Sequence, residues 1–227
     1  MNNDSGFMGG LYAISEWVMK FSVTNLLWII FNLPIIYLLL NLLFVERIEG
    51  LIFLMIPVIM LMPILFFPAT TAMFAMVRGW IIHDEGSDKL IKSFWGYYKE
   101  NYKRSVASGL ILTMAWLIWA VDIYYFFNEN QIMMLLFIIM GIVLFVYSIN
   151  LFSITVHYNM KFLPSLKNAF LITMGSPLLF VAVAISSGVV LFISFNVFNF
   201  FLPFLTGSLI AFLSFSAFYR NYLKLIE

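Results

Sequence analysis

Charged residues and cysteine are scarce in this sequence. Of its 227 residues, 10% are charged, and none is a cysteine. Soluble domains carry about 25% charged residues, so this composition excludes an ordinary soluble globular domain. Without cysteine, disulfide bonds and thiolate metal sites are excluded as well.

The sequence also lacks the common catalytic signatures. It has no P-loop, no glycine-rich dinucleotide fingerprint, no HExxH zinc motif and no GxSxG nucleophile motif. Its two histidines, His83 and His157, are distant in the sequence, and the middle of the later apolar segments carries no acid or histidine that could activate a serine. We therefore expect a non-enzymatic protein without catalytic residues, metal sites or cofactors.

Apolar residues make up most of the chain, at 63%, and the mean hydropathy is +1.01. Uncharged runs cover residues 21–45, 50–77 and 168–219. A helix needs about 20 apolar residues to cross the roughly 30 Å hydrocarbon core of a bilayer, so the last run is long enough for two crossings. The alternating pattern of membrane barrel strands is absent. The sequence therefore predicts an all-α, polytopic bundle of transmembrane helices.

Six spans are expected, in a single transmembrane domain that covers residues 1–227. Their approximate positions are 22–44, 51–77, 106–127, 132–156, 177–194 and 200–219. Segments before the first, third and fifth spans show apolar residues at helical spacing, which is typical of amphipathic helices in the membrane interface: 7–21, 89–104 and 165–174. The N-terminus lacks the pattern of a signal peptide, so we expect the first span to be retained.

Cationic residues fall almost entirely on one side of this topology. Eleven of the twelve lysines and arginines lie at the termini or in the loops after spans two and four, and Arg47 alone lies on the other side. Cytoplasmic loops of membrane proteins are enriched in Lys and Arg, so both termini are expected in the cytoplasm. The net charge of +1 gives no reason to expect nucleic-acid binding.

The longest polar stretch begins at the end of the second span and covers residues 68–105. It holds six of the twelve cations, and from Lys89 onward aromatic and basic residues share a helical pattern. Such a surface suits an anionic inner leaflet or a partner protein, and the pattern leaves both open. The candidate docking residues are Arg78, Trp80, Lys89, Lys92, Phe94, Trp95, Tyr98, Lys99, Lys103 and Arg104.

Prolines at positions 57, 63 and 68 predict a kinked or broken second span. Broken helices often build substrate sites in transporters, and a kink that serves packing is the alternative interpretation. The asparagines in the first span are expected either to form hydrogen bonds with neighbouring helices or to contact a substrate. Asp122, near the outer end of the third span, is an interfacial acid or an ion ligand. The candidate transport residues are Asn25, Asn32, Pro68, Thr70, Thr71 and Asp122.

Four segments of the chain resemble the YesL-like family of bacterial integral membrane proteins. They are ISEWVMKFSVTNLLWIIFNLP (14–34), PATTAMFAMVRGWI (68–81), SFWGYYKENYKRS (93–105) and SLKNAFLIT (165–173). The family is a domain of unknown function, so the resemblance carries over no catalytic residue. It implies a bacterial inner (plasma) membrane and a context of carbohydrate uptake and sugar degradation. The sequence departs from the family at Gly79, where a larger residue is common.

Two functional hypotheses follow. The first is an accessory or interaction protein that works beside a sugar permease or a membrane sensor, because the spans lack the midplane acids or histidines expected of a proton-coupled carrier. The second is a small passive or ion-coupled carrier or channel, with its site at the proline-broken second span. The sequence does not decide the oligomeric state, the ligand or the partner.

Overall fold

Helices account for most of the chain. The structure, a computed structural model, describes residues 7–83, 85–87 and 89–226. The helices in order are α1 (Phe7–Phe31), α2 (Leu33–Leu42), α3 (Ile48–Leu61), the π-helical turn η1 (Met62–Phe66), α4 (Phe67–Ile82), α5 (Leu90–Glu129), α6 (Gln131–His157), α7 (Phe162–Gly175), α8 (Pro177–Asn196), α9 (Phe201–Phe204) and α10 (Thr206–Ile226). The all-α class expected from the sequence is confirmed.

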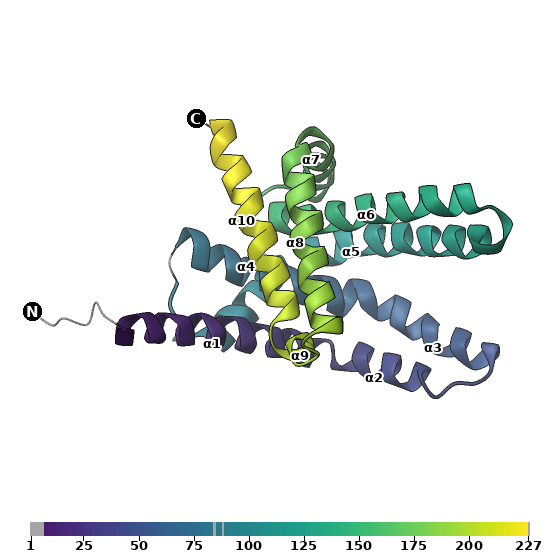
Figure 1. The fold of residues 1–227 in the computed structure, drawn as a ribbon, viewed down its shortest axis with the longest axis horizontal. Helices are drawn as coiled ribbons and strands as arrows, with labels where there is room; N and C mark the ends of the chain where they lie inside the picture. Colours follow the sequence, from purple (N-terminus) through teal and green to yellow (C-terminus); the bar gives the residue numbers. More distant parts are fainter. Residues whose placement is uncertain (1–6, 84, 88, 227) are drawn as a thin grey trace, which may run out of the picture.

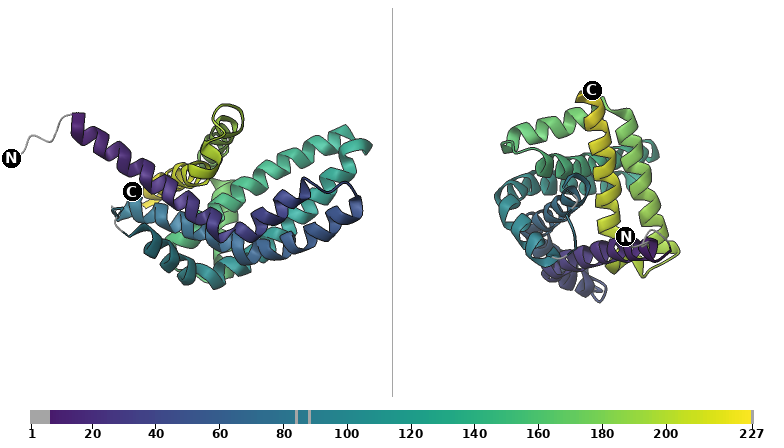
Figure 2. Two further views of the ribbon diagram at one scale, coloured as in Figure 1. Left: turned by 90° about the horizontal axis from the view of Figure 1, so that it is seen from below. Right: turned by 90° about the vertical axis from the view of Figure 1, so that its left-hand side faces the viewer.

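The helices lie in two main directions. The pairs α2–α3 and α5–α6 form hairpins that extend to the same side of the molecule (Figure 1). Helices α8 and α10 lie side by side and run across these hairpins rather than alongside them, as Figure 2 also shows. Helix α4 lies between the two sets and contacts α1, α5, α6 and α10. Both halves of the chain therefore meet around α4.

Helix α4 is buried on nearly every side. From Phe67 to Val77, all residues except Thr70 are buried. Its neighbours approach closely, because a Cβ added at Gly109 of α5 would lie 2.8 Å from the ring of Phe67. Small residues allow membrane helices to come together in this way. The apolar residues of α4 from Phe67 to Val77 thus mainly contact other helices.

The chain is a multi-pass membrane protein. Within the described residues, five helical segments are long and apolar enough to cross a bilayer: Gly9–Phe31, Ile48–Ile82, Leu90–Glu129, Gln131–His157 and Pro177–Asn196. The predicted fourth and fifth spans agree closely with α6 and α8. Helix α10 covers most of the predicted sixth span but is not among the five, so the structure does not establish six spans.

Two of the three predicted boundaries between interfacial helix and span are wrong. Helix α1 continues through residue 21, and α5 continues for 40 residues through residue 105. Neither boundary contains a proline that would end a helix, so amphipathic and apolar segments join into one helix. The third boundary is as expected, because α7 ends at Gly175 and α8 begins at Pro177.

The first predicted span is instead broken in its middle, between α1 and α2. Pro34 lies in the first turn of α2 and has no backbone N–H to continue the helix from α1. At the break, the side-chain amide of Asn32 donates a hydrogen bond to the carbonyl oxygen of Trp28 at 2.8 Å. Membrane helices tolerate breaks when such internal partners are available.

The second predicted span is broken at its prolines, as expected. Pro63 lies in η1, and Pro68 lies in the first turn of α4. A proline clashes with the preceding turn and removes a hydrogen bond, and a π-helical turn absorbs the extra space this requires. Pro57 is accommodated inside α3. The break therefore comes where the chain enters the buried helix α4.

Asn25 joins α1 to α9 and to the first turn of α10. Its Nδ2 donates to the carbonyl oxygens of Leu202 and Pro203 at 3.3 and 2.8 Å, and its Oδ1 accepts from the backbone N–H of Ser208 at 3.2 Å. Backbone groups at helix ends lack partners within the helix and need such bonds. One side chain thus satisfies three backbone groups from the far end of the chain.

We predict that Asn25→Leu lowers the free energy of unfolding by about 1–3 kcal/mol, because buried backbone groups lose their partners. Asn41→Leu is the matched control, since the Asn41 amide bonds the carbonyl of Tyr37 at an exposed position, and it should change stability by less than about 0.5 kcal/mol. Denaturant unfolding in detergent micelles measures both. Equal losses would contradict the role assigned to Asn25.

Candidate functional site

The ten predicted docking residues fall into three groups. Five of them form an exposed face on the first half of α5, which we call the lysine face: Lys89, Lys92, Trp95, Lys99 and Lys103. Trp95 is 48% exposed, and the Nζ atom of Lys99 lies 5.2 Å from the centre of its ring. This cation–π contact orders the middle of the lysine face.

Three predicted docking residues belong to the core and cannot meet a partner. Trp80 packs edge-on against Phe21 of α1, and Phe94 and Tyr98 pack against Phe31. The physical reason is that this side of the amphipathic segment covers α1 instead of lying in the membrane interface. The apolar face of the segment is therefore used for folding, except where Trp95 is exposed.

The two predicted docking arginines bind the end of α6. An Nη1 atom of Arg78 donates to the carbonyl oxygen of Val156, and Nη1 of Arg104 donates to that of Tyr158 at 3.4 Å. Carbonyl groups at a helix C-terminus are unpaired and carry partial negative charge, so guanidinium groups stabilise them. Burial raises the pKa of the Tyr158 phenol, and neighbouring Tyr222 raises it further.

Glu85 folds back over the end of α4, a contact that sequence reasoning did not identify. Its Oε1 accepts a hydrogen bond from the hydroxyl of Tyr97 at 2.9 Å. A Cβ at Gly79 would lie 2.5 Å from Oε2 of Glu85, so the glycine leaves room for the carboxylate. This close approach accounts for the glycine at position 79.

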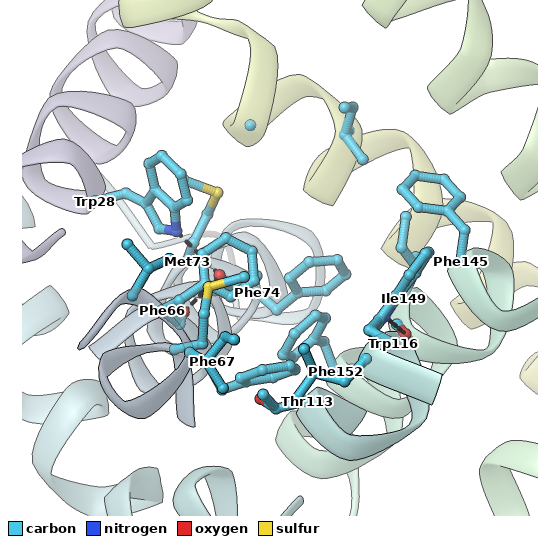
Figure 3. A pocket seen from close by; sticks show the side chains of 18 of the residues that line it. Trp28, Phe66, Phe67, Met73, Phe74, Thr113, Trp116, Phe145, Ile149 and Phe152 are labelled. Atoms are coloured by element: carbon cyan, nitrogen blue, oxygen red, sulfur yellow. Dashed lines mark hydrogen bonds between the residues drawn. The ribbon is translucent and has the colours of Figure 1, made fainter. Parts of the chain in front are cut away.

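A cavity of about 590 Å³ lies beside η1, where the second predicted span is broken (Figure 3). Residues from α1, α3, η1, α4, α5, α6, α8 and α10 form its walls. The residues labelled in Figure 3 are Trp28, Phe66, Phe67, Met73, Phe74, Thr113, Trp116, Phe145, Ile149 and Phe152. Most of them are aromatic or aliphatic.

Thr70 is the predicted transport residue that lines this cavity. Its Oγ1 accepts a hydrogen bond from the indole N–H of Trp28 at 3.0 Å and donates to the carbonyl oxygen of Phe66 at 2.7 Å. The hydroxyl therefore both accepts and donates a hydrogen bond within the protein. The bond to Trp28 connects α1 to α4 at the cavity wall.

The other predicted transport residues do not line the cavity: Asn25, Asn32, Pro68, Thr71 and Asp122. The two asparagines hold the backbone at the α9–α10 segment and at the α1–α2 break. Thr71 donates to the carbonyl of Phe67 at 2.9 Å, as hydroxyls inside helices commonly do. Asp122 is partly exposed in the distal part of α5. The structure thus does not bring these residues together into one site.

The walls of the cavity are mainly apolar. The hydroxyl of Ser148 accepts from the indole of Trp116 at 3.3 Å and donates to the carbonyl of Leu144 at 2.7 Å. Among the described residues that line the cavity, none is charged. No three His, Asp or Glu side chains gather as a metal site in the described part of the chain. A sugar or an ion needs several polar contacts, which this surface does not offer.

Comparison with known proteins places this arrangement in a family. Residues 21–123, from the second half of α1 through most of α5, match the family model described as "Protein of unknown function, DUF624". This region of the chain belongs to that family. It contains the π-helical break, the buried helix α4 and the lysine face.

Two relatives of this chain come from Bacillus subtilis (strain 168). The uncharacterized protein YteU is 28% identical over 69% of this chain and 60% of YteU, so the match spans less than two thirds of that relative. The uncharacterized protein YesL is 27% identical over 92% of this chain and 90% of YesL. The family resemblance seen in the sequence is confirmed. No solved structure matches the chain.

We predict that Arg78→Met lowers the free energy of unfolding by about 1–3 kcal/mol, because the Val156 carbonyl loses a charged donor. Lys99→Met removes a cation from the exposed lysine face and should change stability by less than about 0.5 kcal/mol. Thermal unfolding in detergent compares the two variants. A loss in Lys99→Met as large as in Arg78→Met would show that cationic charge in general, rather than this bond, carries the effect.

Proposed function

We propose that this chain is a non-enzymatic membrane protein that binds a partner protein through the lysine face of α5. The observation that supports this is the division of the basic segment. Lys89, Lys92, Trp95, Lys99 and Lys103 are exposed, while the opposite side of the same helix is held in the core. A binding surface that is fixed before association loses less entropy on binding.

The partner proposed here is a sugar permease or a membrane sensor with an acidic cytoplasmic segment. The acidic chemistry follows from the four lysines of the face. The carbohydrate context is an expectation from the family resemblance. The headgroups of an anionic inner leaflet offer the same charge, so a test of the proposal must separate protein contacts from lipid contacts.

The proposed topology has six spans with both termini in the cytoplasm, and α10 makes the sixth crossing. The distribution of eleven of the twelve cations supports it. The contacts of Arg78 and Arg104 with the end of α6 agree with it, because they hold the loops after α4 and α6 at one end of α6. In this topology the lysine face is cytoplasmic, and Arg47 is outside.

The topology predicts which single cysteines react from outside the cell. The chain has no cysteine, so each introduced cysteine reports one position. In whole cells, Arg47→Cys should react with a membrane-impermeant maleimide, and Lys103→Cys should react only after the membrane is permeabilised. A green fluorescent protein fused to the C-terminus should be fluorescent. Labelling of Lys103→Cys in intact cells would overturn the topology.

Partner binding predicts a site-specific cross-link. A photo-cross-linking amino acid at position 95 should capture a permease or sensor in native membranes, because Trp95 lies in the lysine face. The matched control is position 124 near the other end of α5, where Tyr124 is 84% exposed. Changing Lys92, Lys99 and Lys103 to Glu should abolish the protein cross-link. If position 95 captures lipid alone, or no permease or sensor, the proposal fails.

A carrier or channel is the second candidate, because the cavity lies where the sequence placed a transport site. Its apolar walls do not favour a sugar or an ion as the cargo. Reconstituted liposomes test this candidate with a panel of sugars and ions. Flux that disappears when Pro68 and Thr70 are replaced would support transport, and absence of flux in the wild type would count against it.

A further inference from the structure

We propose that the cavity beside η1 binds an acyl chain of a membrane phospholipid. The site lies among α1, η1, α4, α5, α6 and α10, away from the lysine face, so this inference does not depend on the proposed partner binding. It rests on three observations: the chemistry of the walls, the size of the cavity and a neighbouring cavity at the lipid-facing surface.

The walls offer apolar surface to an occupant. The hydroxyls of Thr70 and Ser148 donate to helix carbonyls and accept from the indoles of Trp28 and Trp116, so all four groups are engaged inside the protein. Thr113 Oγ1 is buried and has no hydrogen-bond partner among the described residues. Figure 3 shows Thr113 beside the rings that form the lower wall. Apart from this hydroxyl, the side chains of the wall offer an occupant apolar contacts.

The size of the cavity argues against an empty space. Engineered apolar cavities of about 150 Å³ stay dry and bind apolar molecules, whereas this cavity measures about 590 Å³. Unfilled volume destabilises a fold in proportion to its size, because the lining atoms lose dispersion contacts. An apolar molecule that fills the space restores those contacts, and water does not.

A second cavity lies next to the site, nearer the outer surface. It measures about 640 Å³, lies between α5–α6 and α8, and shares Trp116, Phe145 and Leu191 with the first. Its rim includes Ile138 and Ile185, which are 38% and 61% exposed. These residues lie on helices that are long and apolar enough to span a bilayer, so their exposed sides face lipid chains.

The bilayer itself is therefore the source of the occupant. Phospholipid acyl chains are long, flexible and apolar, and they surround these helices at the depth of the two cavities. A chain that enters between α6 and α8 passes Trp116 and reaches Met73 of α4 without crossing a charged surface. In this position it contacts both the proline-broken helix and the α8–α10 pair.

Photolabelling in vesicles tests the proposal. The full-length protein is reconstituted into phosphatidylethanolamine and phosphatidylglycerol vesicles that contain a phosphatidylethanolamine with a diazirine near the end of one acyl chain. After irradiation, mass spectrometry should find label on buried lining residues such as Met73 and Ile149. Leu117→Trp fills the cavity and should lower this labelling about tenfold, which corresponds to ~1.4 kcal/mol of binding.

The neighbouring variant Ile118→Trp is the matched control, because Ile118 is 65% exposed and does not line the cavity. It should leave labelling of Met73 and Ile149 unchanged. Ile59→Phe fills the same cavity from α3, and it replaces Leu117→Trp if that variant fails to fold. Label confined to exposed residues, or equal labelling of Met73 in the filled variants, would overturn the proposal.

Thr113→Val separates an acyl chain from a polar ligand. The substitution keeps the shape of the side chain and removes a buried hydroxyl that has no partner in the described structure. Labelling of Met73 by the acyl probe should be retained or increase, because the wall becomes more apolar. A severalfold decrease would show that the occupant depends on the hydroxyl, and would overturn the assignment to an acyl chain.

Discussion

The burial of α4 is the constraint on which the rest of the structure depends. Because nearly every side of this helix is covered, α1, α5, α6 and α10 must all find room against it. Its small side chains and the close approach at Gly109 make this possible. The crossing of α8–α10 over the two hairpins follows, since one central helix has to be enclosed by elements from both halves of the chain.

Polar side chains hold this arrangement where helices end or break. In a membrane each free backbone group needs a partner inside the protein. Asn32 adds a second hydrogen bond to the Trp28 carbonyl at the α1–α2 break, Asn25 serves α9 and the start of α10, and two arginines serve the end of α6. Residues that look like substrate or docking contacts in the sequence are thus used to satisfy the backbone. The lysines of α5, which have no such task, form the exposed face.

Sequence patterns predicted the helices and the break of the second span at its prolines, because a proline acts on its own local turn, but they did not predict the break at Pro34. They failed at residues 21 and 105, since hydrophobicity reports the surroundings of a helix and not its continuity. They also could not place the cavity. Trp28 meets Thr70, and Trp116 meets Ser148, from distant parts of the sequence. Tertiary packing brings these residues together, and no spacing rule in one sequence encodes it. The split of the basic segment between core and surface escaped prediction for the same reason.

The continuity of α5 has a mechanical consequence. At 1.5 Å per residue, its 40 residues form a rod of about 60 Å. One end carries the lysine face, and the distal end forms the hairpin with α6. The buried residues of this rod extend from Leu90 to Thr113, so the half that carries the lysine face is fixed to the core and the distal half extends beyond it. A load applied at the lysine face would therefore act on the core and the α5–α6 hairpin together, without any change in secondary structure.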